Sequence, residues 1–302
     1  MLNWSHVDTL NGVLVIDKPS GWTSHDVVNK ARRFTDTRKV GHLGTLDPMA
    51  TGVLPLLIGR ATRLAQFFGK ADKIYEGSVR FGHSTDSYDA EGKPTSPDVA
   101  VTLDRLVIEE LLESFRGRIW QTPPPVSAKK VQGTRAYKLA RQNVDVQLAP
   151  VEIEIFSIDL LRLEDNAIDL RVHCASGTYM RSIAHDLGKA IGTGAYLSQL
   201  RRVASGGFDL KMSKTLEELA HLSGDGRISE AIIPAAELLP EFPSEYVDAA
   251  TAGFIRQGRD FRVSPFRSAA PSKYVKAVSN DGELLAIGEA KLPNLYHPIL
   301  VL

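Results

Sequence analysis

The chain has 302 residues, of which 43% are hydrophobic and 24% are charged, and its 36 basic and 36 acidic residues give a formal net charge of zero. These values indicate one large or two unequal globular domains and exclude a disordered chain or a uniformly basic nucleic-acid-binding protein. The single cysteine, Cys174, excludes an internal disulfide. Because the sequence shows neither a secretory signal nor eighteen consecutive apolar residues, we expect a cytoplasmic protein with no membrane partner.

The first half of the chain predicts alternating strands and helices. A strand from Gly12 breaks at Pro19, and a helix capped by Thr23 or Ser24 follows and ends near Arg33. A second helix has the apolar positions Val53, Leu57, Leu64 and Phe68. A strand then has Tyr75, Val79 and Phe81 on one face, and a third helix has the apolar stripe Leu103, Val107, Leu111 and Phe115. Pro55 and Gly59 disturb the second of these helices.

The second half predicts a strand pair, a helix and a separate β-rich end. Alternating residues predict antiparallel strands over 151–163 and 167–174. The helix that follows has these signals: start at Thr178, stop at Gly192, and the buried stripe Met180, Ile183, Leu187 and Ile191. Asn280-Asp281-Gly282 predicts a hairpin turn near the end. We therefore expect a mixed α+β body over 1–245, followed by a small β-rich domain over 246–302.

Basic residues gather in two stretches. Between positions 116 and 141 there are seven of them and no acidic residue: Arg116, Arg118, Lys129, Lys130, Arg135, Lys138 and Arg141. The second set is Arg256, Arg259, Arg262, Arg267, Lys273 and Lys276. Asp260 is the only acidic residue between positions 256 and 276. One such cluster alone would be ordinary solvated surface. Two in a neutral chain favour surfaces that bind the phosphates of a nucleic acid.

Asp47 lies in the stretch GHLGTLDPMATGVL, between a glycine-containing turn and a proline. Taken alone, an Asp-Pro pair is most often the N-cap and first turn of a helix. The motifs HExxH, CxxC, GxxxxGK[ST], GxGxxG and GxSxG do not occur, so the sequence predicts neither a metal nor a cofactor. Any chemistry must therefore use carboxylates, arginine, tyrosine and histidine.

Five blocks of the chain resemble, in order, those of the bacterial tRNA pseudouridine-55 synthases, the TruB-type family. They are DKPSGWTSHDVV, GHLGTLDPMATGVLPLLIGRATRL, KIYEGSVRFGHSTDSYDAEG, PPPVSAKKVQGTRAYKLAR and CASGTYMRSIAHDLG. Leu43 and Val126 depart from residues that many relatives carry in these blocks. The resemblance implies a pseudouridine-synthase-like fold, in which helices flank a mixed, mainly antiparallel sheet. It also implies a PUA-like C-terminal domain and a basic RNA-gripping insertion over about 116–146.

The resemblance further implies an isomerase that converts uridine to pseudouridine at position 55 in the T-loop of tRNA, without cofactor or metal. By similarity Asp47 is the catalytic carboxylate, acting on ribose C1′ or on the uracil ring as nucleophile or as base. Arg181 is its partner, and Tyr75 contacts the flipped base and is a candidate for the proton step at carbon 5. Burial should raise the pKa of Asp47, and Arg181 should oppose that shift.

The remaining residues that the resemblance implies would bind the RNA. They are His42, which would fill the gap left by the flipped uridine, Tyr179 and Leu200 at the base, Lys129 and Lys130 in the basic segment, and Lys18, which either supports the pocket or touches phosphate. Alone, each would be an ordinary surface or core residue. We expect a monomer that binds the T-arm stem-loop. The alternatives are a non-catalytic RNA-binding protein and a synthase with a different RNA target.

Overall fold

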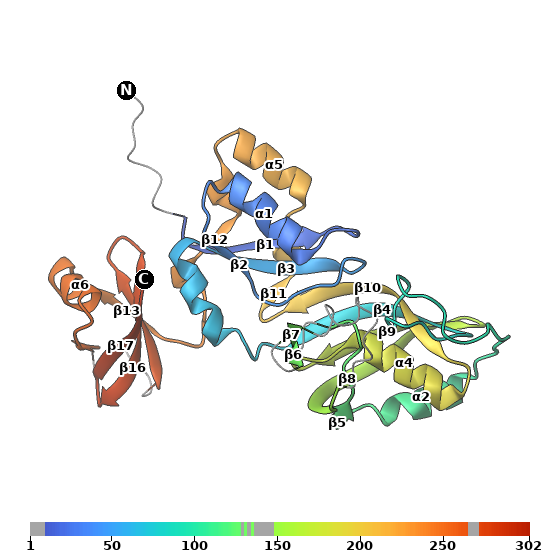
Figure 1. Ribbon diagram of the computed structural model, residues 1–302. Helices are drawn as coiled ribbons and strands as arrows, with labels where there is room; N and C mark the ends of the chain where they lie inside the picture. The colour runs from blue at the N-terminus through green and yellow to red at the C-terminus, as the bar shows by residue number, and fades with distance from the viewer. Residues whose placement is uncertain (1–9, 128–129, 132–133, 136–147, 265–271) are drawn as a thin grey trace.

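The computed structural model of the protein describes residues 10–127, 130–131, 134–135, 148–264 and 272–302 (Figure 1). Its main feature is a ten-stranded sheet in the order β12-β1-β3-β10-β4-β9-β8-β5, with β2 paired to β3 and β11 to β10. The strands are β1 (Gly12–Lys18), β2 (Val40–His42), β3 (Thr51–Ile58), β4 (Lys73–Phe81), β5 (Gly117–Gln121), β8 (Val151–Leu163), β9 (Ala167–Cys174), β10 (Ala195–Ser205), β11 (Phe208–Asp209) and β12 (Ile232–Pro234). Only the β10–β3 pairing is parallel in this sheet, which confirms the expected mixed, mainly antiparallel α+β fold.

Helices pack on this sheet at two places. Helices α1 (Ser24–Phe34) and α5 (Leu216–Gly224) lie over the part containing β1 and β3, whereas α2 (Arg105–Glu113) and α4 (Met180–Ile191) lie at the part containing β8 and β9 (Figure 1). The short 3-10 helices are η1 (Gly59–Phe67), η2 (Leu210–Met212), η3 (Ile228–Ala231) and η4 (Ala235–Glu237). A two-stranded piece, β6 (Lys130–Val131) and β7 (Thr134–Arg135), lies within the basic segment.

Helix α1 confirms the predicted start signal. Thr23 is its N-cap, and its side chain accepts a hydrogen bond from the Asp26 backbone, while the Asp26 carboxylate accepts one from the Thr23 backbone. This reciprocal pair satisfies two backbone donors that the first turn of any helix leaves free. Because the cap fixes where the helix begins, it also fixes the position of Ser24 at its buried first residue.

The helix predicted from Val53 to Phe68 is wrong in its first half. Residues 51–58 form strand β3, and only 59–67 turn into the 3-10 helix η1. The strand shows no alternation because it is buried on both faces: Leu54 and Leu56 face the core under α1, whereas Val53 and Leu57 face a second core. An apolar run buried on both sides has no periodicity that separates a strand from a helix.

Three further predictions can be compared with the structure. Helix α2 exists, and its own buried residues are Ile108 and Leu112. Of the predicted stripe, Phe115 is buried, Leu103 and Leu111 pack partly buried against the core, and Val107 is exposed. Strands β8 and β9 form the predicted antiparallel pair. Helix α4 ends at Gly192, in the left-handed conformation with φ of 86°, as predicted. It begins one residue later than predicted, with Tyr179 rather than Thr178 at the N-cap.

The C-terminal part forms a second, five-stranded sheet in the order β13-β15-β16-β17-β14. Its elements are β13 (Ser244–Val247), α6 (Ala249–Arg256), β14 (Phe261–Arg262), β15 (Tyr274–Ser279), β16 (Leu284–Leu292) and β17 (Leu295–Val301). The predicted hairpin joins β15 to β16, and the Gly282 amide closes its turn on the Ser279 carbonyl. Val278, Leu284 and Ile287 pack with Val13 and other β1 and β3 residues, so the two sheets share one hydrophobic core.

Among the residues that the structure describes, no helix combines the length and the apolar character that crossing a bilayer would require.

Candidate active site

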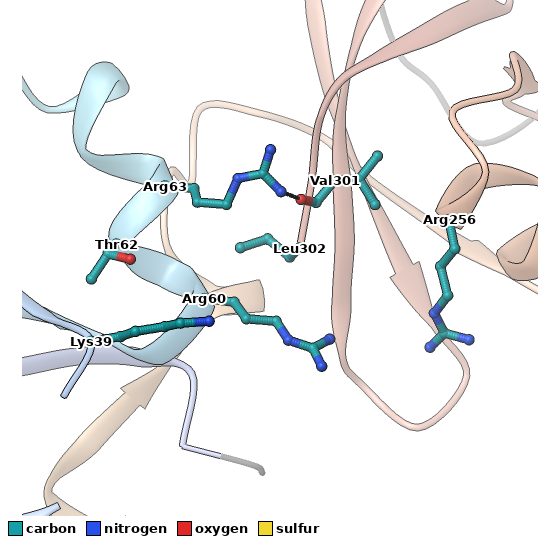
Figure 2. A pocket seen from close by; sticks show the side chains of 7 residues that line it. All are labelled: Lys39, Arg60, Thr62, Arg63, Arg256, Val301 and Leu302. Carbon is teal, nitrogen blue, oxygen red and sulfur yellow. Dashed lines mark hydrogen bonds between the residues drawn. The ribbon is translucent and has the colours of Figure 1, made fainter. Parts of the chain in front are cut away.

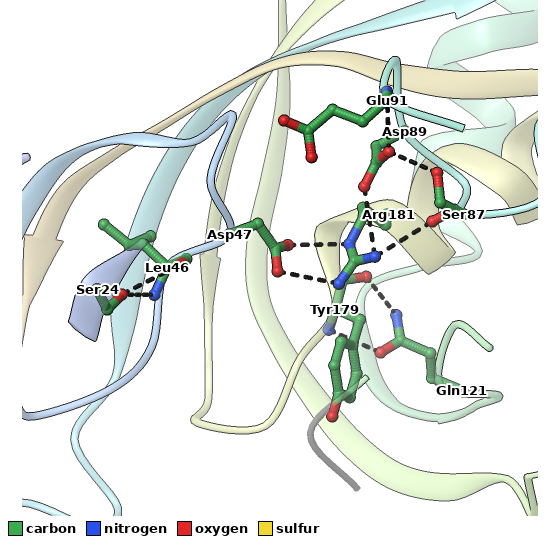
Figure 3. Close-up of polar contacts among 9 residues, drawn as sticks. All are labelled: Ser24, Leu46, Asp47, Ser87, Asp89, Glu91, Gln121, Tyr179 and Arg181. Carbon is green, nitrogen blue, oxygen red and sulfur yellow. Dashed lines mark hydrogen bonds and ion pairs between the residues drawn. The ribbon is translucent and has the colours of Figure 1, made fainter. Parts of the chain in front are cut away.

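Asp47 lies in the loop of residues 43–50 that joins β2 to β3, hereafter the catalytic loop. No helix follows it, so the helix-cap interpretation is wrong. Ser24 fixes the loop immediately before Asp47, because its hydroxyl donates to the Leu46 carbonyl at 3.0 Å and accepts from the Leu46 amide at 2.8 Å (Figure 3). The Gly21 amide donates to the Pro48 carbonyl on the other side of Asp47. The start of the chain therefore holds the loop on both sides of the carboxylate.

Lys18, at the end of β1, also supports the catalytic loop. Its side chain is fully buried, and Nζ donates to the carbonyls of Pro19, Trp22 and Pro48 at 2.9, 2.6 and 3.1 Å. Burial lowers the pKa of Lys18 to about 8, and the nearby Asp47 charge opposes that shift. An ammonium with three carbonyl partners and no exposed surface cannot reach a phosphate. Of the two roles that the resemblance implies for Lys18, these contacts favour support of the pocket over contact with phosphate.

Arg181 reaches Asp47 from helix α4, 134 residues further along the chain. Its Nη2 donates to Oδ1 of Asp47 at 3.0 Å, and its Nε lies 2.9 Å from Oδ2 (Figure 3). Two parallel contacts of this kind form the bidentate pair that only a planar guanidinium makes. The Arg181 side chain is 7% exposed and that of Asp47 is 35% exposed, so the carboxylate faces outward while its partner is enclosed.

Asp89 is a member of this cluster that sequence reasoning missed. Its Oδ2 lies 3.3 Å from Nη1 of Arg181, and the same Nη1 donates to the Ser87 carbonyl at 3.2 Å. Asp89 also accepts hydrogen bonds from the Ser87 hydroxyl and the Glu91 amide. The sequence predicts only a turn in TDSYDAEG, because burial of Asp89 is not visible in it. Two carboxylates thus share one guanidinium. The buried Asp89 contacts its Nη1, and the partly exposed Asp47 contacts its Nε and Nη2.

The charge state of Asp47 follows from three competing effects. Burial raises its pKa, the Arg181 charge lowers it, and the Asp89 charge raises it again. Burial is the largest effect, even with about a third of the side chain accessible, because dense protein surrounds the remainder. The predicted direction of both the burial effect and the Arg181 effect is confirmed.

Tyr75 and Leu200 lie on adjacent strands beside the catalytic loop. In the β4–β10 pairing, Tyr75 is opposite Arg202 and Gly77 is opposite Leu200, so the side chains of Tyr75, Leu200 and Arg202 share one face of the sheet. Tyr75 is 7% and Leu200 8% exposed, and both belong to the main core. Burial raises the pKa of Tyr75, while the positive charge of Arg202 opposes the shift. Arg202 was not singled out from the sequence.

Tyr179 precedes helix α4, and Gln121 fixes its backbone. The Gln121 side-chain oxygen accepts from the Tyr179 amide at 2.8 Å, and its nitrogen donates to the Tyr179 carbonyl at 3.0 Å (Figure 3). His42 is exposed at the end of β2, next to the catalytic loop. Lys129 lies outside the described residues, and of Lys130 only the backbone strand is described.

The two basic stretches differ from what the sequence predicts. Arg116 pairs with Glu113 and Arg118 lies near Glu154, so the start of the basic segment is compensated by acidic neighbours. In the C-terminal part, Lys276 is buried and donates to two backbone carbonyls, which removes it from any binding surface. Lys273 pairs there with Glu289. The C-terminal cations therefore do not form one continuous unopposed face.

A cavity of about 620 Å³ lies between the 3-10 helix η1 and the C-terminal part, and Asp47 does not line it (Figure 2). Its lining residues are Lys39, Arg60, Thr62, Arg63, Arg256, Val301 and Leu302. Arg63 donates a hydrogen bond to the Val301 carbonyl, which ties η1 to the last strand. Glu283 pairs with both Arg60 and Arg256, at 3.9 and 3.1 Å. The cavity is therefore cationic, with one carboxylate at its edge.

Within the described ranges, no three His, Cys, Asp or Glu side chains are grouped closely enough to hold a metal ion. The Asp47 cluster contains two carboxylates and an arginine that occupies both of them. Such a set can position one carboxylate toward a substrate, and the arginine charge favours its ionised form against the effect of burial.

Comparison with known proteins gives concordant matches. Residues 32–180 match the model of the TruB family pseudouridylate synthase N-terminal domain, and residues 181–239 match that of the tRNA pseudouridylate synthase B C-terminal domain. The tRNA pseudouridine synthase B of Solibacter usitatus is 61% identical over 97% of this chain and 100% of its own. That of Aquifex aeolicus is 39% identical over 93% of this chain and 96% of its own.

Solved structures give the same fold. A chain in a Cbf5-Nop10-Gar1 complex is 26% identical with a TM-score of 0.67, covering 96% of this chain and 80% of that one. A chain in an H/ACA RNP bound to a substrate RNA containing 2'-deoxyuridine is 24% identical with a TM-score of 0.70, over 97% and 85% of the two chains. The second likeness shows the fold alone.

Proposed function

Because the chain belongs to the TruB family of pseudouridylate synthases, we propose that it isomerises uridine to pseudouridine at position 55, in the T-loop of tRNA. The observation that carries this proposal is the bidentate Asp47–Arg181 pair beside the buried Tyr75. A protein that only binds RNA gains nothing from a partly exposed carboxylate clamped by an enclosed arginine. The reaction breaks the N-glycosidic bond, turns the uracil and joins it to the ribose through carbon 5, which leaves the redox state unchanged.

Asp47 acts as the ionised carboxylate, on ribose C1′ or on the uracil ring. The exposed part of its side chain is available to substrate, while Arg181 and Asp89 fix its orientation from inside. An oxygen pair positioned in this way needs no reorganisation when charge develops at the sugar or base. Burial raises the pKa of Asp47, and the charge of Arg181 opposes that shift and so favours the ionised carboxylate.

A uridine stacked within a loop must leave the stack before Asp47 can reach it, at a cost of a few kcal/mol. His42 is exposed next to the catalytic loop and would fill the space that the base leaves. Tyr75 and Leu200 form the wall beside the base, and Tyr179 lies at the start of α4 close to Arg181. Lys129 and Lys130 would bind phosphates of the T-arm, since they belong to the basic segment.

Residues 1–245 would form the catalytic domain, with the basic insertion at about 116–146, and residues 246–302 a PUA-like domain that binds RNA away from the reacting loop. The cationic cavity between η1 and the C-terminal part supports this division, because Arg60 and Arg256 reach it from opposite sides. We place the protein in the cytoplasm as a monomer, where it meets tRNA without a partner subunit.

The test is incubation of unmodified tRNA with the wild-type chain and with Asp47→Asn, without added cofactor. Pseudouridine is mapped by base-specific chemical labelling, and tRNA affinity is measured by filter binding. We expect product at position 55 with the wild type and none with Asp47→Asn, with similar affinities. Binding without product from the wild type would favour the RNA-binding protein, and product at another position would favour a different RNA target.

A further inference from the structure

Arg202 is a fully buried arginine on β10 that no part of the proposed mechanism uses. Its Nε donates to the Val53 carbonyl at 2.8 Å, and its Nη2 donates to the Gly44 carbonyl at 3.1 Å. Gly44 belongs to the catalytic loop, three residues before Asp47, and has a φ of 116° that a residue with a side chain rarely adopts. Arg202 therefore connects the sheet to the loop that carries Asp47.

The third nitrogen of this guanidinium, Nη1, is buried and has no hydrogen-bond partner among the described residues. Among the described residues no ion pair joins Arg202 to a carboxylate, and its positive charge acts on another cation, Lys73, whose pKa burial lowers and Arg202 lowers further. A buried charge with no counter-charge is strongly destabilising. A group kept in that state is a candidate for a role in chemistry.

Tyr75 is directly opposite Arg202 in the antiparallel β4–β10 pairing. Side chains opposite each other in such a pairing have Cβ atoms about 5 Å apart and point to the same face. The phenol of Tyr75 interacts with the charges of both Arg202 and Asp47. Arg202 is sealed from solvent and can act on a substrate only through Tyr75 or the loop.

We propose that Arg202 is a positioning residue for Tyr75, which it aligns and polarises for removal of the proton from carbon 5. This inference rests on the proposed function. Once carbon 5 is bonded to the ribose, the C5–H bond breaks and its electron pair forms the C5=C6 double bond. The C6=N1 pair moves to N1, which takes a proton from solvent. The proton from carbon 5 goes to the phenol oxygen of Tyr75, whose own proton passes to solvent in the same step. Burial raises the pKa of Tyr75, and the Arg202 charge opposes that shift, so Arg202 lowers the cost of the negative charge that develops on this oxygen.

The experiment measures single-turnover pseudouridine formation on tRNA carrying hydrogen or deuterium at carbon 5 of the target uridine. Arg202→Met should slow formation by about 100-fold, a typical contribution of positioned acid–base groups, and should show a larger deuterium effect than the wild type. Arg202→Lys, which keeps the charge, should recover part of the rate. The matched control is Arg201→Met, because its neighbour Arg201 is partly exposed and pairs with Asp17 instead.

The deuterium effect separates this role from a structural one. If Arg202 only anchored Gly44, its loss would slow earlier steps, and deuterium at carbon 5 would make no additional difference. A folded Arg202→Met protein with an unchanged deuterium effect would overturn the proposal, and so would a folded Arg202→Lys protein that is slowed without a larger deuterium effect. If Arg202→Met fails to fold, the Arg202→Lys result decides in the same way. A wild-type protein that forms no pseudouridine would instead refute the proposed function.

Discussion

Replacing Arg181 by lysine keeps a positive charge but removes the planar group that contacts Asp47, Asp89 and the Ser87 carbonyl. A lysine ammonium cannot span both oxygens of Asp47 and reach Asp89 as well. The variant therefore loses about two charge-assisted hydrogen bonds, or about 3 kcal/mol in an enclosed site. That corresponds to a rate about 10²-fold lower. We expect the loss in the single-turnover rate and not in tRNA affinity.

The rate can be followed as tritium released from tRNA labelled at carbon 5, because pseudouridine formation removes that hydrogen. Arg171→Lys is the matched control, since Arg171 pairs with Glu76 on an exposed part of the same sheet. Its rate should equal that of the wild type. If Arg181→Lys turned over within twofold of the wild type, the bidentate pair would not be part of the mechanism.

The same residue gives a pH test. Burial raises the pKa of Asp47 and Arg181 opposes that shift, so removing the cation must raise the pKa further. The reaction needs the ionised carboxylate, and its rate falls as the pH drops through that pKa. We expect the acid limb of the rate profile to lie above the ordinary aspartate value of 3.8 and to move to higher pH in Arg181→Met. An acid limb that stays in place would show that Arg181 does not control the charge of Asp47.

Three further variants test the support and the RNA contacts. Ser24→Ala leaves the buried Leu46 amide without its partner, so it should cost about 1–3 kcal/mol in unfolding free energy, measured in urea, and a Ser24→Thr protein with the same loss would show that the hydroxyl is not the cause. Lys18→Met should lower the melting temperature and leave the salt dependence of tRNA binding unchanged; a flatter dependence would restore Lys18 as a phosphate contact. Lys129→Ala with Lys130→Ala should weaken tRNA binding and flatten its salt dependence, and unchanged affinity at several salt concentrations would exclude the gripping role.

The sequence by itself determined the local features whose causes lie within a few residues. Thr23 and Asp26 are three positions apart and form the capping box wherever this helix is placed. Gly192 ends α4 because it adopts the left-handed conformation without strain, and Asn280-Asp281-Gly282 closes a hairpin for a similar reason. The order of the motifs was also sufficient to identify the family, and with it the fold class, and it implies the roles that we propose for Asp47 and Arg181.

Only the tertiary structure decided which residues are buried and which charges meet. The sequence predicts a helix at β3 because the strand is apolar on both faces and shows no alternation. Its second face is covered by a core that comes partly from residues after 270. Asp89 and Arg202 gave no local signal, since their partners lie on other elements that the sheet brings together. The sequence alone leaves Lys18 available to phosphate, whereas in the structure its ammonium donates to three backbone carbonyls. Burial and charge pairing depend on contacts distant in the chain, and a linear pattern does not contain them.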